Sequence, residues 1–412
     1  MKRYFFGDNC KVTVNQDKVV IGNSYNGHWI KISKECYDIL LEGQNEKLSI
    51  KAVLENFEDA EDREYLKCLF TSLRNLGVLY CEGEKQEQPK RGVLISVTHR
   101  CNLKCRHCFV SASPELDDQL LYDNLIEIID KVCEFGVQQI VFTGGEPLVR
   151  SDFLAILKYT RNKFDGTIGL MTNGTLINEK NASVLVSNLD TIDISLDGID
   201  EQTCSKIRGK GVFEKVISAI KLLQREGFEK ISLSMVMTKE NEAYEKEFDL
   251  LNEQLGTMPM KRKFSPVGRG SDNREEFELH VEENKNPIMD IETAQQEVAI
   301  CHCGVISKTL YINYDGGIYP CNTLEKPQYV LGNINDYKTL DFLKDTCCLK
   351  SIEGYRRMEN IFPENFAKCK ECSVNLFCWE CLHFIDMANE GIIEIGDCSK
   401  RKRELEAIVW SD

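Results

Sequence analysis

The chain has 412 residues, of which 42% are hydrophobic, so it is long enough for two or three domains with cores of their own. Its formal net charge of −15, its short apolar runs and the lack of a secretory signal pattern argue against nucleic acid and membrane partners, and they predict a cytoplasmic protein. Nineteen cysteines in such a chain indicate metal binding or catalysis rather than disulfides.

Residues 1–85 are predicted to form a small α+β module. Alternating apolar and polar residues between 9 and 32 predict three short strands, and helical periodicity follows from residue 36 onward. A polar run with a proline, at 82–91, indicates a linker. This winged-helix-like order is compatible with DNA binding, with a structural cap, or with pairing of an extended peptide to a strand edge; the acidic charge disfavours DNA.

From residue 92 to about 290, predicted strands alternate with amphipathic helices. The six strands are expected at 93–97, 139–142, 167–171, 191–196, 230–237 and 261–265. This order predicts a parallel sheet with helices outside it. We expect an α/β fold with a partial (β/α)6 TIM-like barrel, because unusual motifs follow the carboxyl ends of successive strands, where barrel enzymes place their active sites.

Three cysteines form a C-x3-C-x2-C cluster directly after the first of these strands: Cys101, Cys105 and Cys108. Three thiolates are one ligand short of a closed four-thiolate site, so a [4Fe–4S] cluster bound to them keeps one iron open to a small molecule. The alternative is a zinc site whose fourth ligand is His107 or a residue from elsewhere.

The cysteine cluster with His107 in its aromatic slot, followed by Gly144-Gly145-Glu146-Pro147, resembles the radical S-adenosylmethionine (SAM) superfamily across residues 92–270. The resemblance implies that SAM binds the open iron and that one electron, supplied by a donor such as flavodoxin or ferredoxin, splits SAM into methionine and a 5′-deoxyadenosyl radical. It makes the three cysteines catalytic. Its cofactor-binding candidates are His107, Gly144, Gly145, Glu146, Thr172, Asn173, Ser195, Asp197 and Arg208.

Among these candidates, Arg208 is expected to pair with the carboxylate of SAM, because a guanidinium group matches a carboxylate geometrically. A surface charge in a loop is the alternative for this residue. Arg269 is a weaker candidate of the same kind.

A second set of cysteines lies in residues 295–412, and its spacing resembles the SPASM domain. Seven or eight thiolates are too many for one zinc ion and suit two further [4Fe–4S] clusters, which makes three in the chain. The resemblance implies an outer cluster on Cys369, Cys372, Cys378 and Cys398, and an inner cluster on Cys303, Cys321 and Cys381 with Cys301 as a candidate fourth ligand. Two residues separate Cys378 from Cys381, where the family has three, so one ligand set stays open.

The order of module (1–85), radical SAM core (92–290) and SPASM domain (295–412) resembles the maturases of sactipeptides and ranthipeptides. It implies an oxidoreductase that cross-links a ribosomally made precursor peptide, in the first place by a thioether from a cysteine sulfur to carbon, with the leader held by residues 1–85. Three alternatives stay open: a carbon–carbon cross-linking maturase, an anaerobic sulfatase-type maturase, and a non-catalytic iron–sulfur or zinc protein that senses redox state or binds DNA through the winged-helix-like module.

Overall fold

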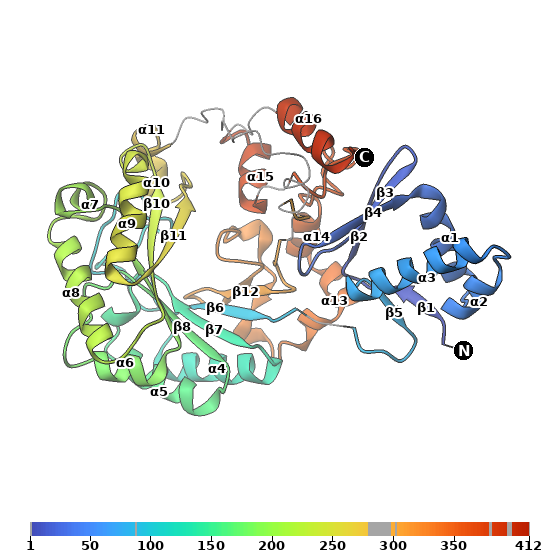
Figure 1. Ribbon diagram of the computed structural model, residues 1–412. Helices are drawn as coiled ribbons and strands as arrows, with labels where there is room; N and C mark the ends of the chain where they lie inside the picture. Colours follow the sequence, from blue (N-terminus) through green and yellow to red (C-terminus); the bar gives the residue numbers. More distant parts are fainter. Residues whose placement is uncertain are drawn as a thin grey trace. The chain divides into compact units, whose positions relative to one another are not determined.

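The computed structural model describes residues 2–86, 89–278, 298–300, 303–378, 381–393 and 398–411. The chain divides into two compact units, each shown in Figure 1 and each built from separate stretches of sequence. Unit 1 contains Met1–Pro89, Glu283–Gly304 and Arg357–Asp412, and unit 2 contains Lys90–Glu282 and Val305–Arg356. The domain boundaries expected from the motifs stay a prediction, because compactness and sequence motifs need not divide a chain at the same residues.

A nine-stranded sheet forms the centre of unit 2, in the order β11-β10-β9-β8-β7-β6-β12-β13-β14. Six consecutive strands are parallel, as the sequence predicts: β6 (Gly92–Ser96), β7 (Gln139–Thr143), β8 (Thr167–Thr172), β9 (Thr191–Ser195), β10 (Ile231–Met237) and β11 (Met258–Lys263). The α/β fold with a partial TIM-like barrel is therefore confirmed. The sixth strand differs clearly from its expected range, since it begins three residues earlier.

The far edge of this sheet comes from a part of the chain that the periodicity did not assign to it. β12 (Thr309–Ile312) pairs in parallel with β6, from Thr309 opposite Gly92 to Ile312 opposite Ile95. β13 (Gly317–Tyr319) and β14 (Gly332–Asn333) extend the sheet by antiparallel pairing. The first predicted barrel strand thus lies inside the sheet, with neighbours on both sides.

The helices that follow the parallel strands of unit 2 lie on the outer side of the sheet in Figure 1. They are α4 (Tyr122–Phe135), α5 (Phe153–Lys163), α6 (Ala182–Asn188), α7 (Glu201–Arg208), α8 (Val212–Arg225) and α9 (Glu245–Leu255), followed by the short α10 (Arg269–Asp272) and α11 (Arg274–Phe277). α4 buries an apolar stripe at helical spacing, including Leu125, Ile129 and Val132, against the sheet. It ends at Gly136, whose φ of 82° lies in the left-handed region that glycine adopts without strain.

The first part of unit 1 contains the three predicted strands, followed by helices where the sequence shows helical periodicity. β2 (Cys10–Asn15), β3 (Lys18–Asn23) and β4 (Trp29–Ser33) form an antiparallel sheet with β3 in the middle. α1 (Lys34–Asn45), α2 (Ile50–Glu55) and α3 (Ala60–Asn75) follow, and a short pair that the sequence did not predict, β1 (Tyr4–Phe6) with β5 (Leu79–Cys81), closes the module. One face of the sheet and these helices share a core that includes Leu40, Phe70 and Leu73.

The opposite face of this small sheet packs against the end of the chain. Val20 of β3 is fully buried in a second core with Ile300, Phe377 and Val409. α15 (Leu382–Asn389) and α16 (Cys398–Val409) belong to the same unit. Because β3 is covered on both faces, its sequence is apolar without alternation from Val19 to Ile21. Among the described residues, no helix combines the length and the apolar character that a membrane crossing requires.

Candidate active site

The loop between β6 and α4 places the three cysteines of the C-x3-C-x2-C cluster at the carboxyl ends of the parallel strands. Cys101 and Cys105 are buried, and Cys108 is half-buried. Backbone N–H groups point at two of the sulfurs: Leu103 N donates to Cys101 Sγ at 3.4 Å, and Ala112 N donates to Cys108 Sγ at 3.3 Å. Such donors stabilise thiolates, as metal coordination of the cysteines requires.

Burial makes the thiols of Cys101 and Cys105 poor acids unless a cation binds them. Burial, with the charges of Glu146 and of the neighbouring cysteines, raises the pKa of Cys101 to about 11, against the opposing hydrogen bond from Leu103. Burial also raises the pKa of Cys105, which the nearby Arg208 opposes. Three neighbouring thiols, two of them buried and two with N–H donors, fit an iron–sulfur cluster, whose iron ions supply the missing positive charge.

The Gly144-Gly145 turn after β7 packs directly on the cysteine loop. Gly145 N donates to Thr98 O at 2.7 Å, and Glu146 N donates to Arg100 O at 2.8 Å. A Cβ atom on Gly144 would lie 2.2 Å from Thr98 O, and one on Gly145 would lie 2.2 Å from Arg100 O. Both positions therefore require glycine for close packing, whatever they also offer to a cofactor.

Glu146 is fully buried and accepts hydrogen bonds from the strand next to it. Its oxygens accept from Thr172 Oγ1 at 2.8 and 3.0 Å, from Asn173 N at 2.7 Å and from Leu148 N at 3.1 Å. Burial raises its pKa, while these hydrogen bonds and the charge of Arg208 oppose the increase. The amide of Asn173 also lies 3.7 Å from Cys101 Sγ, so two predicted cofactor residues are fixed against the turn and the cysteine loop.

Asp197 links three further elements at the same rim. It has no exposed surface, and its Oδ2 lies 2.5 Å from His107 Nε2 and 2.6 Å from Arg208 Nε, while its Oδ1 accepts from Val236 N at 2.7 Å. Burial alone raises its pKa, but Arg208 and His107 together hold the pKa of this carboxyl below its ordinary value. Asp197 is thus a buried anion between a buried guanidinium group and an imidazole from the cysteine loop.

Arg208 is the last residue of α7, and its side chain is 8% exposed, so the surface-charge alternative is wrong. Its Nη1 lies 3.9 Å from Cys105 Sγ, which places it between the cysteine loop and Asp197. Its expected pairing with the SAM carboxylate stays a prediction. The half-buried Ser195, at the end of β9, lies on the same rim. Arg269 donates from Nε to Cys105 O at 2.9 Å.

The four cysteines predicted for the outer cluster interact electrostatically in the structure. Burial and the thiols of Cys398, Cys372 and Cys369 raise the pKa of Cys378 to about 11 against the opposing charge of Arg401. All four thiols belong to one segment of unit 1, Arg357–Asp412, and charges interact more strongly at short range. Among the described residues, no group of three or more cysteine, histidine or carboxylate side chains converges as a site for a metal ion.

The predicted inner set is less complete in the described part of the chain. Cys301 lies outside the described residues. Cys303 and Cys321 are half-buried, and Cys381 is exposed at the start of α15. Cys303 and Cys321 belong to different compact units, so their joint ligation stays a prediction.

Comparisons with known proteins identify two domains in the chain. Residues 95–251 match the Radical SAM superfamily, and residues 301–373 match SPASM, an iron-sulfur cluster-binding domain. The chain carries a radical SAM domain and a SPASM domain. The predicted resemblance to these families is thereby confirmed.

Curated relatives match about half of the chain and carry names that differ in the product they make. The chain is 33% identical over 177 residues to mycofactocin maturase MftC of Mycolicibacterium smegmatis, covering 43% of this chain and 45% of the relative. It is 35% identical over 200 residues to Fe-coproporphyrin III synthase of Methanosarcina barkeri, covering 48% and 49%. The chain thus spans about half the length of these relatives, and their names do not agree on a substrate.

Solved structures extend the likeness beyond the radical SAM domain. SuiB of Streptococcus suis bound to its precursor peptide SuiA has a TM-score of 0.55 at 16% identity, and the match covers 94% of this chain and 97% of SuiB. The enzyme anSMEcpe with bound AdoMet and the Cp18Cys peptide has a TM-score of 0.54 at 19% identity, covering 78% and 97%. At such identities the likeness shows the fold alone.

Proposed function

We propose that this radical SAM protein is an oxidoreductase that matures a ribosomally made precursor peptide, most specifically by joining a cysteine sulfur to a carbon atom as a thioether. The observation that carries the proposal is the fold likeness to SuiB, which extends over 94% of the chain and so takes in the N-terminal module as well as the radical SAM domain. The match to anSMEcpe covers 78% of the chain, and the part that it leaves uncovered is about the size of the N-terminal module.

The contacts at this rim support a separate role for each group of residues. Cys101, Cys105 and Cys108 would hold a [4Fe–4S] cluster with an open iron, which supplies the electron that cleaves SAM. The buried carboxylates, Glu146 and Asp197, would orient the ammonium end of SAM and the guanidinium of Arg208 around that position. Burial of these groups keeps water away from the reacting atoms.

The net reaction balances without an added oxidant. SAM, a peptide thiol and a C–H group give methionine, 5′-deoxyadenosine, a thioether and a proton. One hydrogen atom passes from carbon to the deoxyadenosyl group, the thiol loses its proton, and the electron that starts the cycle is returned when the C–S bond forms. A donor such as flavodoxin or ferredoxin would supply the first electron. The auxiliary clusters, one of them on Cys369, Cys372, Cys378 and Cys398, would suit transfer of the returned electron.

The small sheet of unit 1 supports recognition of the leader. Within the described residues, β2 and β4 each pair with β3 on one side only, so the other side of each strand offers backbone groups to an added strand. Val14 of β2 is 46% exposed and offers an apolar side chain beside that edge. We propose that the leader pairs with one of these edges.

The test is co-expression with a short cysteine-rich peptide encoded beside this gene, followed by mass spectrometry of the peptide. A thioether maturase produces a loss of two hydrogens per cross-link and a mapped sulfur-to-carbon bond, and Cys105→Ala abolishes it. A sulfatase-type maturase, the second candidate because of the anSMEcpe likeness, instead oxidises one cysteine or serine without forming a ring.

Iron analysis tests the proposed cofactors separately. Three [4Fe–4S] clusters give about twelve irons per chain. A value near four, with zinc recovered in addition, would contradict the two auxiliary clusters.

A further inference from the structure

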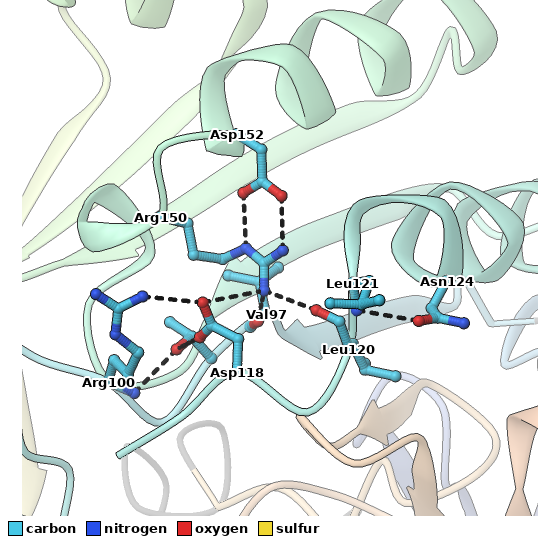
Figure 2. Close-up of polar contacts among 9 residues, drawn as sticks. Val97, Arg100, Asp118, Leu120, Leu121, Asn124, Arg150 and Asp152 are labelled. Atoms are coloured by element: carbon cyan, nitrogen blue, oxygen red, sulfur yellow. Dashed lines mark hydrogen bonds and ion pairs between the residues drawn. The ribbon is translucent and has the colours of Figure 1, made fainter. Parts of the chain in front are cut away.

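A buried arginine outside the predicted site joins both ends of the cysteine loop. Arg150 follows the short helix η1 (Pro147–Val149), directly after the Gly-Gly-Glu turn, and its side chain is 3% exposed. Its Nη1 donates to Val97 O at 3.0 Å and to Leu120 O at 2.9 Å, as Figure 2 shows. Val97 directly follows β6, and Leu120 lies just before α4, so one guanidinium group holds the two ends of the stretch that carries the three cysteines.

The remaining donors of Arg150 are fixed by a carboxylate. Its Nε and Nη2 donate to the two oxygens of Asp152 at 2.9 and 2.8 Å, a paired arrangement that the planar guanidinium group allows and a lysine does not. Asp152 lies at the start of α5, so its position is set by a helix that packs on the sheet. Arg150 is therefore a rigid connection and not a mobile surface charge.

Asp118 adds a second connection within the same loop. It is paired with Arg100 Nη1 at 3.1 Å, lies 3.7 Å from Arg150 Nη1, and accepts a hydrogen bond from Thr98 Oγ1. Thr98 Oγ1 in turn accepts from Arg100 N at 2.9 Å. The carbonyl groups of Thr98 and Arg100 are the ones on which the glycine turn packs, so this network controls the contact between turn and loop.

We propose that Arg150 is a positioning residue that sets the register between the cysteine loop and the Gly-Gly-Glu turn, and so the geometry in which the cluster meets SAM. Nothing in the sequence motifs assigns it this role. The inference rests on the SAM-cleaving part of the proposed function and is independent of the peptide. No described contact joins Arg150 to a cysteine sulfur, so its effect would reach the cluster through the backbone of the loop.

A matched control exists in the same unit. Arg161 of α5 also binds backbone carbonyls, Asn188 O at 3.2 Å and Gly166 O at 3.2 Å, and pairs with Asp190. It does so at the amino ends of the strands, because Gly166 directly precedes β8 and Asp190 directly precedes β9. Arg161→Gln should therefore cost some stability, less than Arg150→Gln because its side chain is 26% exposed compared with 3%, but leave the rim unchanged.

The experiment compares Arg150→Gln, Arg150→Lys and Arg161→Gln in the reconstituted, full-length protein. The readouts are iron loss to a chelator, the change in the electron paramagnetic resonance spectrum of the reduced cluster when SAM is added, and KM and kcat for 5′-deoxyadenosine formation. We expect Arg150→Gln to raise KM for SAM roughly 10-fold to 100-fold, as loss of a residue that orients metal ligands usually does, and to speed iron loss. Arg150→Lys should not restore either value, and Arg161→Gln should match the wild type in both.

Equal effects of Arg150→Gln and Arg161→Gln, or an unchanged KM and iron-loss rate in Arg150→Gln, would overturn the proposal. If Arg150→Gln does not fold, Asp118→Asn keeps the guanidinium group, weakens the same network and must shift KM and iron loss in the same direction. A wild-type spectrum that does not respond to SAM would refute the proposed function instead, and iron loss to the chelator would still decide the role of Arg150.

Discussion

Asp197→Asn is the substitution whose effect on the free energy of unfolding can be worked out best from the structure. The change leaves the shape of the side chain but removes the negative charge between Arg208 and His107, both of which are buried. Removing one partner of a buried ion pair costs about 3–5 kcal/mol, because the other charge stays buried without compensation. With a urea dependence of about 2–3 kcal/mol per molar, the midpoint of unfolding should fall by about 1–2 M.

The matched control is Asp193, which lies on β9, four residues before Asp197. Asp193→Asn removes the charge that pairs with Arg262, whose side chain is 36% exposed, compared with 8% for Arg208. An exposed pair contributes about 0–1 kcal/mol, so this variant should stay close to the wild type. The assay is urea unfolding of the metal-free protein followed by circular dichroism.

A double variant separates the lost charge from lost packing. Arg208→Met in the Asp197→Asn background removes the uncompensated guanidinium group, so part of the lost stability should return. The reasoning would be refuted if Asp197→Asn and Asp193→Asn lowered the midpoint equally, or if the double variant were less stable than Asp197→Asn alone.

Three further predictions concern other parts of the chain. Gly145→Ala should destabilise unit 2 by about 1–3 kcal/mol, because its Cβ would lie 2.2 Å from Arg100 O, and an unchanged thermal midpoint would contradict this. Burial, together with the charge of Asp315, raises the pKa of Glu325 to about 7. The contribution of this carboxyl to stability is therefore present at acidic pH and is lost as the pH rises from about 4.5 to 7. Glu325→Gln should flatten the pH dependence of the free energy of unfolding by up to about 3 kcal/mol, and parallel curves for the variant and the wild type would contradict this prediction. Trp29→Ala should lower the iron content by about four irons per chain while SAM cleavage persists. The reason is that Trp29 packs edge-on against Phe377, next to Cys378, in the core behind the outer cysteines. Full iron content in this variant would contradict the prediction.

The shared core changes how leader binding should be tested. Trp29 also donates from Nε1 to Val298 O at 2.6 Å, and Lys31 Nζ donates to Val409 O at 3.1 Å, so the first sheet supports the end of the chain. Deleting residues 1–85 would remove the leader site and one wall of this core together. Substitution of Val14 at the exposed edge of β2 is a cleaner test, because a weakened peptide turnover with full iron content would report on the leader alone.

Local pattern was enough to predict the alternating strands and helices, the cysteine loop and the glycine turn. Periodicity and short spacings reflect contacts between residues that are close in sequence. A short apolar run such as 139–142 is typical of a strand in any parallel sheet. The common position of the motifs after strand ends predicted their meeting at one rim, and the structure places Cys101, Glu146 and Asp197 there.

Contacts between distant segments were decided only by the tertiary structure. The pairing of β12 with β6 and the packing of Phe377 near Val20 join residues more than two hundred positions apart, and their pattern alone does not specify a partner or a register. In the sequence, Arg208 could not be distinguished from a surface charge, and Arg150 belonged to no motif that was assigned a role. Their roles depend on burial and on which carbonyl or carboxylate group lies opposite, and these quantities exist only once the chain has folded.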